Sequence, residues 1–224
     1  MKLKVIITGS TGMVGKGVLL ECLDHPDVES ILVVNRKPVG MSHPKLKEVI
    51  HQDFFNVDVI RHHLEGFNAC FFCLGVSAAG MSEGKYTHLT YDLTIGFAKA
   101  LVDLNPEMTF CYVSGMGTDE SEKGRQMWAR VKGRTENDLM KLGFREVFLF
   151  RPGFIQPYKG VRPASAWYGA LYPVFKPLYP LLKRIFPGAV TTSVNVGLAM
   201  INAAKKGYPK RRLENPDINK LAGV

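Results

Sequence analysis

Cysteines are few in this sequence, and their arrangement predicts neither a disulfide framework nor a metal site. The 224 residues include four cysteines. Cys70 and Cys73 form a CxxC motif, but they belong to the apolar run 69–74, where strand alternation would place them on opposite faces. We interpret them as buried strand residues. The six histidines also lack metal-ligand spacing, so no metal is expected.

The cysteine usage also bears on the compartment. Intracellular proteins keep their thiols reduced, and a chain without a disulfide framework fits that environment. The first predicted strand begins at residue 3, so we expect no secretion signal. Together these observations predict a cytoplasmic location.

A hydrophobic run long enough to cross a membrane is also missing. The longest apolar stretch, 164–186, is interrupted by three prolines and three basic residues, Pro173, Lys176, Pro177, Pro180, Lys183 and Arg184. These residues exclude a transmembrane helix. The stretch could be part of the core, or a surface that lies on lipid or on a partner. We favour a substrate lid formed by residues 154–192.

Acidic residues are outnumbered by basic ones, 20 to 29, which gives a net charge of +9. The densest basic cluster, 205–212, has neither the interleaved aromatics nor a recognition motif typical of nucleic-acid binding. We interpret the charge as a solvated face that also attracts an anionic cofactor, and we expect no nucleic-acid partner.

Strand and helix patterns alternate along the chain. This alternation predicts one α/β domain, residues 1–224, with a doubly wound parallel sheet of the Rossmann type and a small C-terminal substrate region. The ligand crevice is expected at the carboxyl ends of the strands. The expected strands are 3–7, 30–35, 46–51, 69–74, 108–113 and 146–150, and the expected helices are 13–23, 57–64, 86–104, 125–142 and 193–206.

A glycine-spaced turn joins the first strand to the first helix. Gly9 lets the chain turn sharply, Gly12 lets the backbone approach a pyrophosphate, and Gly15 lets the helix pack closely. Free N–H groups and the positive end of the helix dipole would face the phosphates. The alternative is an ordinary glycine-rich loop. The predicted cofactor contacts here are Gly9, Ser10, Thr11, Gly12, Met13, Val14 and Gly15.

The spacing TGxxGxxG, which begins at Thr8, resembles the opening of the extended and atypical branches of the short-chain dehydrogenase/reductase superfamily. A site that prefers NAD places Asp or Glu at the end of the second strand. This chain has Arg36 and Lys37 after Asn35, and a guanidinium can pair with a 2′-phosphate. The residues therefore predict NADP(H) in preference to NAD(H), unless Arg36 and Lys37 are only surface residues of a loop.

The resemblance implies further contacts with the nucleotide. Asp53 and Phe54 follow the third strand, where the superfamily caps the adenine ring. Leu74 and Gly75 end the fourth strand, where the superfamily uses a small residue beside the ribose. Asp53 could instead be the N-cap of the next helix.

The superfamily reduces carbonyls with Ser, Tyr and Lys, the last two in a YxxxK motif. Ser114 matches the Ser, and Lys132 matches the Lys that holds the nicotinamide ribose. Trp128 occupies the Tyr position, and an indole N–H cannot relay a proton. Ser114 and Lys132 are thus the predicted catalytic residues, with a water or an unassigned acid as proton donor. The acids considered are Tyr86, His88, Tyr91, Asp92 and Tyr158.

Four short stretches are similar to the Tat-interacting-protein-like branch of atypical short-chain dehydrogenases: residues 72–75, 131–133, 150–153 and 213–215. The resemblance implies NADP(H) binding with oxidoreductase activity on a small carbonyl or alcohol. The alternative function is a noncatalytic NADP(H)-binding redox sensor or partner-binding regulator. The substrate is not specified by the sequence, and the oligomeric state stays open, a homodimer included.

Overall fold

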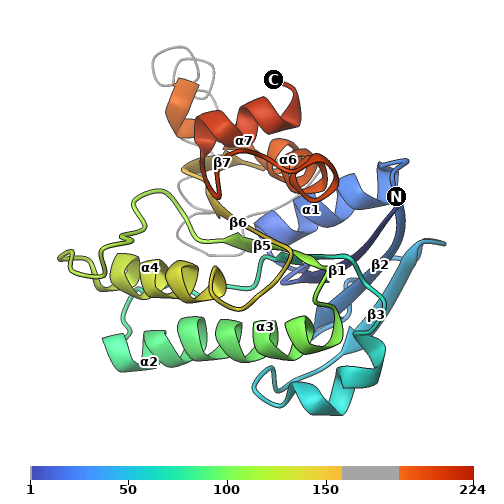
Figure 1. Ribbon diagram of the computed structural model, residues 1–224, viewed down its shortest axis with the longest axis horizontal. Helices are drawn as coiled ribbons and strands as arrows, with labels where there is room; N and C mark the ends of the chain where they lie inside the picture. Colours follow the sequence, from blue (N-terminus) through green and yellow to red (C-terminus); the bar gives the residue numbers. More distant parts are fainter. Residues whose placement is uncertain (1, 158–186) are drawn as a thin grey trace.

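The computed structural model describes residues 2–157 and 187–224, and its centre is a seven-stranded sheet in the order β3-β2-β1-β4-β5-β6-β9 (Figure 1). Neighbouring strands are parallel throughout. The strand order reverses between β1 and β4, which confirms the predicted doubly wound sheet. The strands are β1 (Leu3–Thr8), β2 (Val28–Asn35), β3 (Leu46–Ile50), β4 (Ala69–Phe72), β5 (Thr109–Val113), β6 (Glu146–Arg151) and β9 (Arg212–Glu214).

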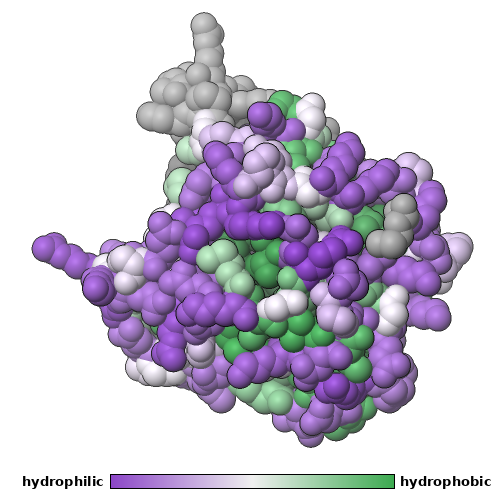
Figure 2. Space-filling model, viewed as in Figure 1, coloured by the Kyte–Doolittle hydropathy of each residue, from purple (hydrophilic) through white to green (hydrophobic). Residues whose placement is uncertain are grey.

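Helices cover both faces of the sheet and enclose two hydrophobic cores (Figure 1). One face carries α1 (Met13–Asp24), α6 (Ser193–Lys206) and α7 (Asn215–Ala222). The other carries η1 (Val57–His63), α2 (Glu83–Thr87), the π-helical turn η2 (His88–Asp92), α3 (Leu93–Leu104) and α4 (Met127–Leu139). On the face seen in Figure 2, hydrophilic residues cover most of the surface, as expected when the apolar side chains fill these cores.

The two cysteines of the CxxC motif lie on opposite sides of the sheet, as strand alternation predicts. Cys70 belongs to the core beneath α3, whereas Cys73 packs against the core beneath α1. Desolvation raises the pKa of Cys73 to about 12 and also raises the pKa values of Cys22, Cys70 and Cys111. The four thiols are therefore protonated at neutral pH and poor nucleophiles.

The helix expected over 86–104 is interrupted, because η2 widens the backbone between α2 and α3. This turn places Tyr91 against α4, where its hydroxyl donates to Asp138 at 2.8 Å. The guanidinium of Arg134 lies 4.3 Å from the centroid of the Tyr91 ring. A local contact between two helices thus accompanies a break that hydrophobic periodicity does not reveal.

The C-terminal region contains more regular structure than expected. After η3 (Pro187–Ala189), β8 (Val190–Thr192) pairs in parallel with β7 (Phe154–Gln156). These two strands flank residues 158–186, so most of the proposed lid lies outside the described residues. Within 2–157 and 187–224, no helix combines the length and apolarity needed to cross a membrane.

Helices α1 and α6 approach each other through glycines. A Cβ added to Gly17 would lie 2.5 Å from the Cβ of Ser193 and 3.0 Å from its carbonyl oxygen. A Cβ added to Gly197 would lie 2.8 Å from the Cγ of Glu21. Since α1 carries the glycine-spaced turn at its start, this contact fixes the position of the turn relative to the sheet.

Substitution of Gly17 by Ala is expected to lower the free energy of unfolding by about 1–3 kcal/mol, because the added methyl group overpacks a contact with backbone. Gly96→Ala in α3 is the matched control, since its Cβ would meet nothing within 4 Å. That change is expected to stabilise the protein by roughly 0.5–1 kcal/mol through helix propensity. Urea unfolding of both variants measures the difference, and equal effects would contradict the proposed packing.

A buried ion pair connects the far side of the sheet to α4. Glu136 on α4 is fully buried, and Arg151 at the end of β6 donates to its carboxylate at 2.5 Å and 3.0 Å. Arg151 also reaches Glu214, at the end of β9, at 3.3 Å. The hydrogen bonds and charge of Glu136 raise the pKa of Arg151 against the opposing effect of desolvation. This pair holds β6, β9 and α4 together at the carboxyl edge of the sheet.

Arg151→Met is expected to destabilise the protein by about 3–5 kcal/mol, because it removes the guanidinium that hydrogen-bonds to the buried Glu136 carboxylate and leaves that charge with the more distant Arg212, at 3.4 Å. The double variant Glu136→Met/Arg151→Met is expected to recover much of that loss, since no uncompensated charge remains. Arg61→Met removes an arginine from an exposed pair with Asp58 and is expected to cost under about 1 kcal/mol. Urea unfolding measures all three, and a double variant no better than Arg151→Met would contradict this account.

Candidate functional site

The turn after β1 is built by close backbone contacts. Gly9 has a φ of 68°, and a Cβ there would lie 2.7 Å from the carbonyl oxygen of Cys73. A Cβ on Gly15 would overlap the carbonyl oxygen of Gly9. Gly9 therefore makes the sharp turn that the sequence predicts. The close contact that requires Gly15 is with the turn itself.

Gly12 leaves the start of α1 open. It occupies the N-cap position, where no side chain caps the helix, and its own N–H donates to Gly9 at 2.9 Å. A Cβ on Gly12 would meet only that Gly9 oxygen, at 3.3 Å. The first turn of α1 contains no acidic residue. The positive end of the helix dipole is thus accessible to an anion.

Ser10 points away from the opening of the turn. It is fully buried, and its hydroxyl hydrogen-bonds with the side chain of Asn35 at the end of β2, at 2.8 Å and 3.0 Å. Asn35 also donates to Glu48 on β3 at 3.2 Å. The side chain of Ser10 therefore braces the turn against β2. Thr11 is exposed, while Met13 and Val14 are half-buried.

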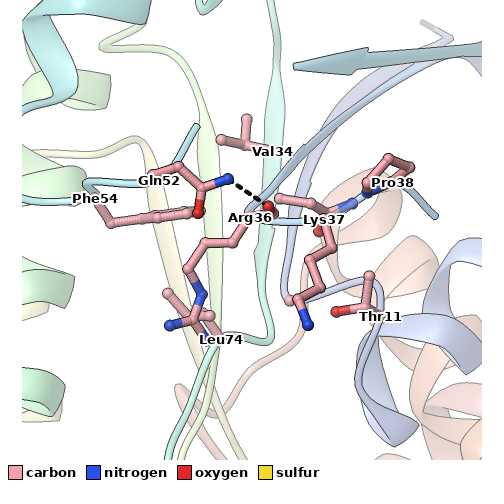
Figure 3. A pocket seen from close by; sticks show the side chains of 10 residues that line it. Thr11, Val34, Arg36, Lys37, Pro38, Gln52, Phe54 and Leu74 are labelled. Carbon is pink, nitrogen blue, oxygen red and sulfur yellow. Dashed lines mark hydrogen bonds between the residues drawn. The ribbon is translucent and has the colours of Figure 1, made fainter. Parts of the chain in front are cut away.

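A pocket of about 600 Å³ opens at the carboxyl ends of β1, β2 and β4 (Figure 3). Arg36 and Lys37 are exposed at its rim, and no ion pair involves either of them in the part of the chain that the structure describes. In Figure 3 the ammonium of Lys37 lies toward Thr11 and the guanidinium of Arg36 toward Leu74. The lining residues are Gly9, Thr11, Val34, Asn35, Arg36, Lys37, Pro38, Gln52, Phe54 and Leu74.

A second pocket, of about 330 Å³, adjoins the first and is mostly apolar. It contains the predicted residues Asp53, Phe54, Leu74 and Gly75. Its apolar wall continues onto η2 and α3 through Leu89 and Leu93, which together with Phe55 and Val76 were not predicted from the sequence.

The carboxylate of Asp53 accepts a hydrogen bond from the N–H of Phe55 at 3.0 Å, and the N-cap of η1 is Asn56. The alternative that Asp53 caps the helix is therefore wrong. A Cβ on Gly75 would have open space around it, so this position leaves room beside the pocket.

Gln52 is the polar pocket residue that sequence reasoning missed. Its amide donates to the carbonyl oxygen of Arg36 at 2.6 Å, which links the loop after β3 to the loop after β2 (Figure 3). It directly precedes Asp53 at the end of the third predicted strand. That adjacency was the signal that could have identified it.

Ser114 lies at the end of β5 and is buried. Its hydroxyl donates to Glu136 at 2.6 Å and also lies 3.2 Å from the carbonyl oxygen of Phe150. The resemblance implies that the catalytic Ser polarises a substrate oxygen. Ser114 could do so only if its hydrogen bond to Glu136 breaks.

Lys132 reaches the same place from α4. Its ammonium donates to the carbonyl oxygen of Ser114. Desolvation lowers the pKa of Lys132 to about 8, against an opposing effect of the Glu136 carboxylate. Trp128, one turn earlier on α4, is half-buried and lies over Gly117 in the loop after β5. The structure thus brings Ser114 and Lys132 together, as their predicted shared role requires.

The other acids considered are buried or engaged with partners of their own. Tyr86 is buried, and desolvation raises its pKa. Desolvation and the hydrogen bond to Asp138 raise the pKa of Tyr91. His88 lies 3.1 Å from Asp92 and stacks on Phe55 with ring centroids 4.3 Å apart. Tyr158 lies outside the described residues.

The basic cluster near the C-terminus is largely paired with acids. Lys205 pairs with Asp27 and Arg211 with Glu146, while Lys210 lies 2.8 Å from Asp217 and Arg212 lies 2.9 Å from Glu120. This pairing contrasts with Arg36 and Lys37, for which the described part of the chain offers no ion-pair partner. Within 2–157 and 187–224, no group of three His, Cys, Asp or Glu side chains is placed to hold a metal ion.

No model of a known protein family matches the chain. The mitochondrial protein fmp52 of Emericella nidulans is 30% identical over 210 residues, which are 88% of this chain and 88% of that protein. The mitochondrial protein FMP52 of Debaryomyces hansenii is 29% identical over 153 residues, which are 67% of this chain and 66% of that protein, slightly less than two thirds of its length.

Among solved structures, the Bordetella bronchiseptica enzyme WbmF in complex with NAD+ superposes with a TM-score of 0.68 at 14% identity. The match covers 99% of this chain and 77% of that one. It confirms the predicted Rossmann-type fold. The similarity to the Tat-interacting-protein-like branch stays a prediction.

The names of the relatives contradict the expected cytoplasmic location, because several of them are mitochondrial proteins. Reduced cysteines are found in more than one intracellular compartment, so the cysteine argument could not decide between them. The match to the E. nidulans protein, 30% identical across 88% of each chain, shows that this chain belongs to the FMP52 family.

Proposed function

We propose that the protein binds NADP(H) at the carboxyl ends of β1, β2 and β4 and uses it in an oxidoreductase reaction on a small carbonyl or alcohol. The observation that carries this proposal is the pocket of about 600 Å³ whose rim presents Arg36 and Lys37, without an ion-pair partner among residues 2–157 and 187–224, next to the open start of α1. An acid would stand at the end of β2 in a site that prefers NAD.

The residues present fit each part of that nucleotide. The backbone of Gly9 to Gly15 would receive the pyrophosphate, and Arg36 and Lys37 would pair with the 2′-phosphate. The adjoining apolar pocket, with Asp53 and Phe54, would take the adenine. The same fold holds NAD+ in WbmF.

Hydride transfer would occur beyond the pyrophosphate, toward the end of β5. The nicotinamide, when bound, supplies or accepts a hydride. Lys132, which reaches the end of β5, would hold the nicotinamide ribose there.

A second function, a noncatalytic redox sensor that binds NADP(H), is favoured by one observation. The Ser114 hydroxyl donates to Glu136, and Trp128 lacks an acidic proton. Ser114 and Trp128 stand where the superfamily has its catalytic Ser and Tyr. Neither side chain is therefore free to donate a proton to a substrate oxygen.

We propose that the protein is located in mitochondria, because several relatives are named as mitochondrial proteins. Fractionation of cells that express the protein from its own gene would show it in the mitochondrial fraction. Recovery in the cytosol alone would contradict this proposal.

Arg36→Ala is expected to weaken NADPH binding by about tenfold or more and NADH binding far less, because only NADPH offers the phosphate that pairs with the guanidinium. Arg61→Ala is the matched control, since it removes the same charge from η1, outside both pocket linings. Calorimetric titration with both nucleotides measures the change. Equal losses for NADPH and NADH would refute the role of Arg36.

Turnover separates the two functions. If the protein is an oxidoreductase, NADPH oxidation is expected with at least one member of a panel of aldehydes, ketones and quinones. The reaction is followed by the absorbance of NADPH, at an NADPH concentration that saturates the protein. Tight NADPH binding without oxidation by any panel member would instead support the sensor.

A further inference from the structure

Reduction of a carbonyl requires a proton in addition to a hydride, and this inference rests on the oxidoreductase function proposed above. The end of β5 and the start of α4 offer few groups that can supply that proton. The Ser114 hydroxyl donates a hydrogen bond to Glu136. Positions 115 and 117 are glycines, and Thr118 donates to the carbonyl oxygen of Gly115 at 2.7 Å.

Lys132 differs from these hydroxyl groups because it has hydrogen-bond donors that are not in use within the described residues. An ammonium has three N–H donors, and in the described residues one of them is used, by the carbonyl oxygen of Ser114. That carbonyl marks the carboxyl edge of the sheet, where parallel sheets bind their ligands. The ammonium is therefore held at the carboxyl end of β5, and two of its donors are not used within the described residues.

The charged surroundings of Lys132 leave it able to lose a proton. Glu136, one turn later on α4, is the carboxylate that acts on it. That carboxylate is already bound by Arg151 from β6 and by the Ser114 hydroxyl, and Arg212 from β9 lies 3.4 Å from it. Ser114, whose backbone carbonyl oxygen accepts from Lys132, has a side chain without charge. Desolvation consequently dominates and lowers the pKa of Lys132 to about 8.

We propose that Lys132 is itself the proton donor for the substrate oxygen, in place of a tyrosine. As the hydride reaches the carbonyl carbon, the C=O π bond becomes a lone pair on oxygen. One N–H bond of Lys132 breaks, and its proton forms the new O–H bond. The amine is left neutral and regains a proton from water. The sum is carbonyl, NADPH and one proton giving alcohol and NADP+.

The first test compares Lys132→Arg with the wild-type protein. Arginine keeps the positive charge but does not release a proton near neutral pH, so kcat for carbonyl reduction, measured at saturating NADPH, is expected to fall by about a hundredfold or more. Lys141→Arg, beyond the end of α4 and exposed, is the matched control and is expected to leave kcat unchanged.

The pH profile gives a second readout. Reduction needs the protonated lysine, so kcat is expected to be flat below about pH 8 and to fall as pH rises through that value. Alcohol oxidation needs the neutral amine and is expected to rise over the same range. A tyrosine restored at position 128, Trp128→Tyr, is expected to recover part of the turnover in the Lys132→Arg background.

A third readout does not depend on activity. Reductive 13C-methylation followed by NMR titration, with Lys132→Arg to assign the peak, is expected to show one lysine titrating near pH 8 among lysines that titrate near about 10.4. A Lys132 midpoint at about 10 or above overturns the proposal. So does full turnover in Lys132→Arg, or NADPH binding without turnover in the wild-type protein. If the wild-type protein does not bind NADPH at all, the proposed function itself fails.

Discussion

The site depends on the close approach of three backbone segments at the end of β1. Gly9 turns against the carbonyl of Cys73 at the end of β4, and α1 then packs onto the carbonyl of Gly9 through Gly15. Because no side chain fits between these segments, α1 begins directly at the edge of the sheet. Its uncapped first turn consequently faces the pocket. Every other feature of the proposed nucleotide site is placed relative to this turn.

The distribution of charge supports the same site. The protein carries a net charge of +9, but the densest basic cluster in the sequence is paired with Asp27, Glu120, Glu146 and Asp217. Arg36 and Lys37 have no such partners in the part of the chain that the structure describes. The excess of positive charge in the composition therefore does not indicate what the protein binds. Two cations on a pocket rim that have no partner within the described residues favour an anionic ligand.

Sequence reasoning predicted the sheet, its order of elements and most of the pocket, because hydrophobic periodicity and glycine spacing are local properties. It located α6 over residues 193–206 as the structure has it. It did not predict β9 and α7, although Pro216 and the capping box of Glu214 and Asp217 were readable signals. The widened turn η2 could not be predicted, because it accompanies a contact of Tyr91 with α4, which is distant in sequence.

The direction in which a side chain points could not be predicted from the sequence either. Ser10 and Ser114 occupy predicted positions, yet both hydroxyls point into the protein and bond to Asn35 and Glu136. The partners come from β2 and α4, so neither bond could be inferred from the local pattern. The consequence for the proposed chemistry is that neither hydroxyl is free to donate to a substrate oxygen.

The most direct measurement of the central claim is the amide NMR spectrum of 15N-labelled protein during titration with NADPH. The account predicts that the largest shifts occur at Gly12 to Gly15, at Arg36 and Lys37, and at the residues that line the adjoining apolar pocket. Saturable shifts confined to a different surface, or no shifts at millimolar NADPH, would contradict it.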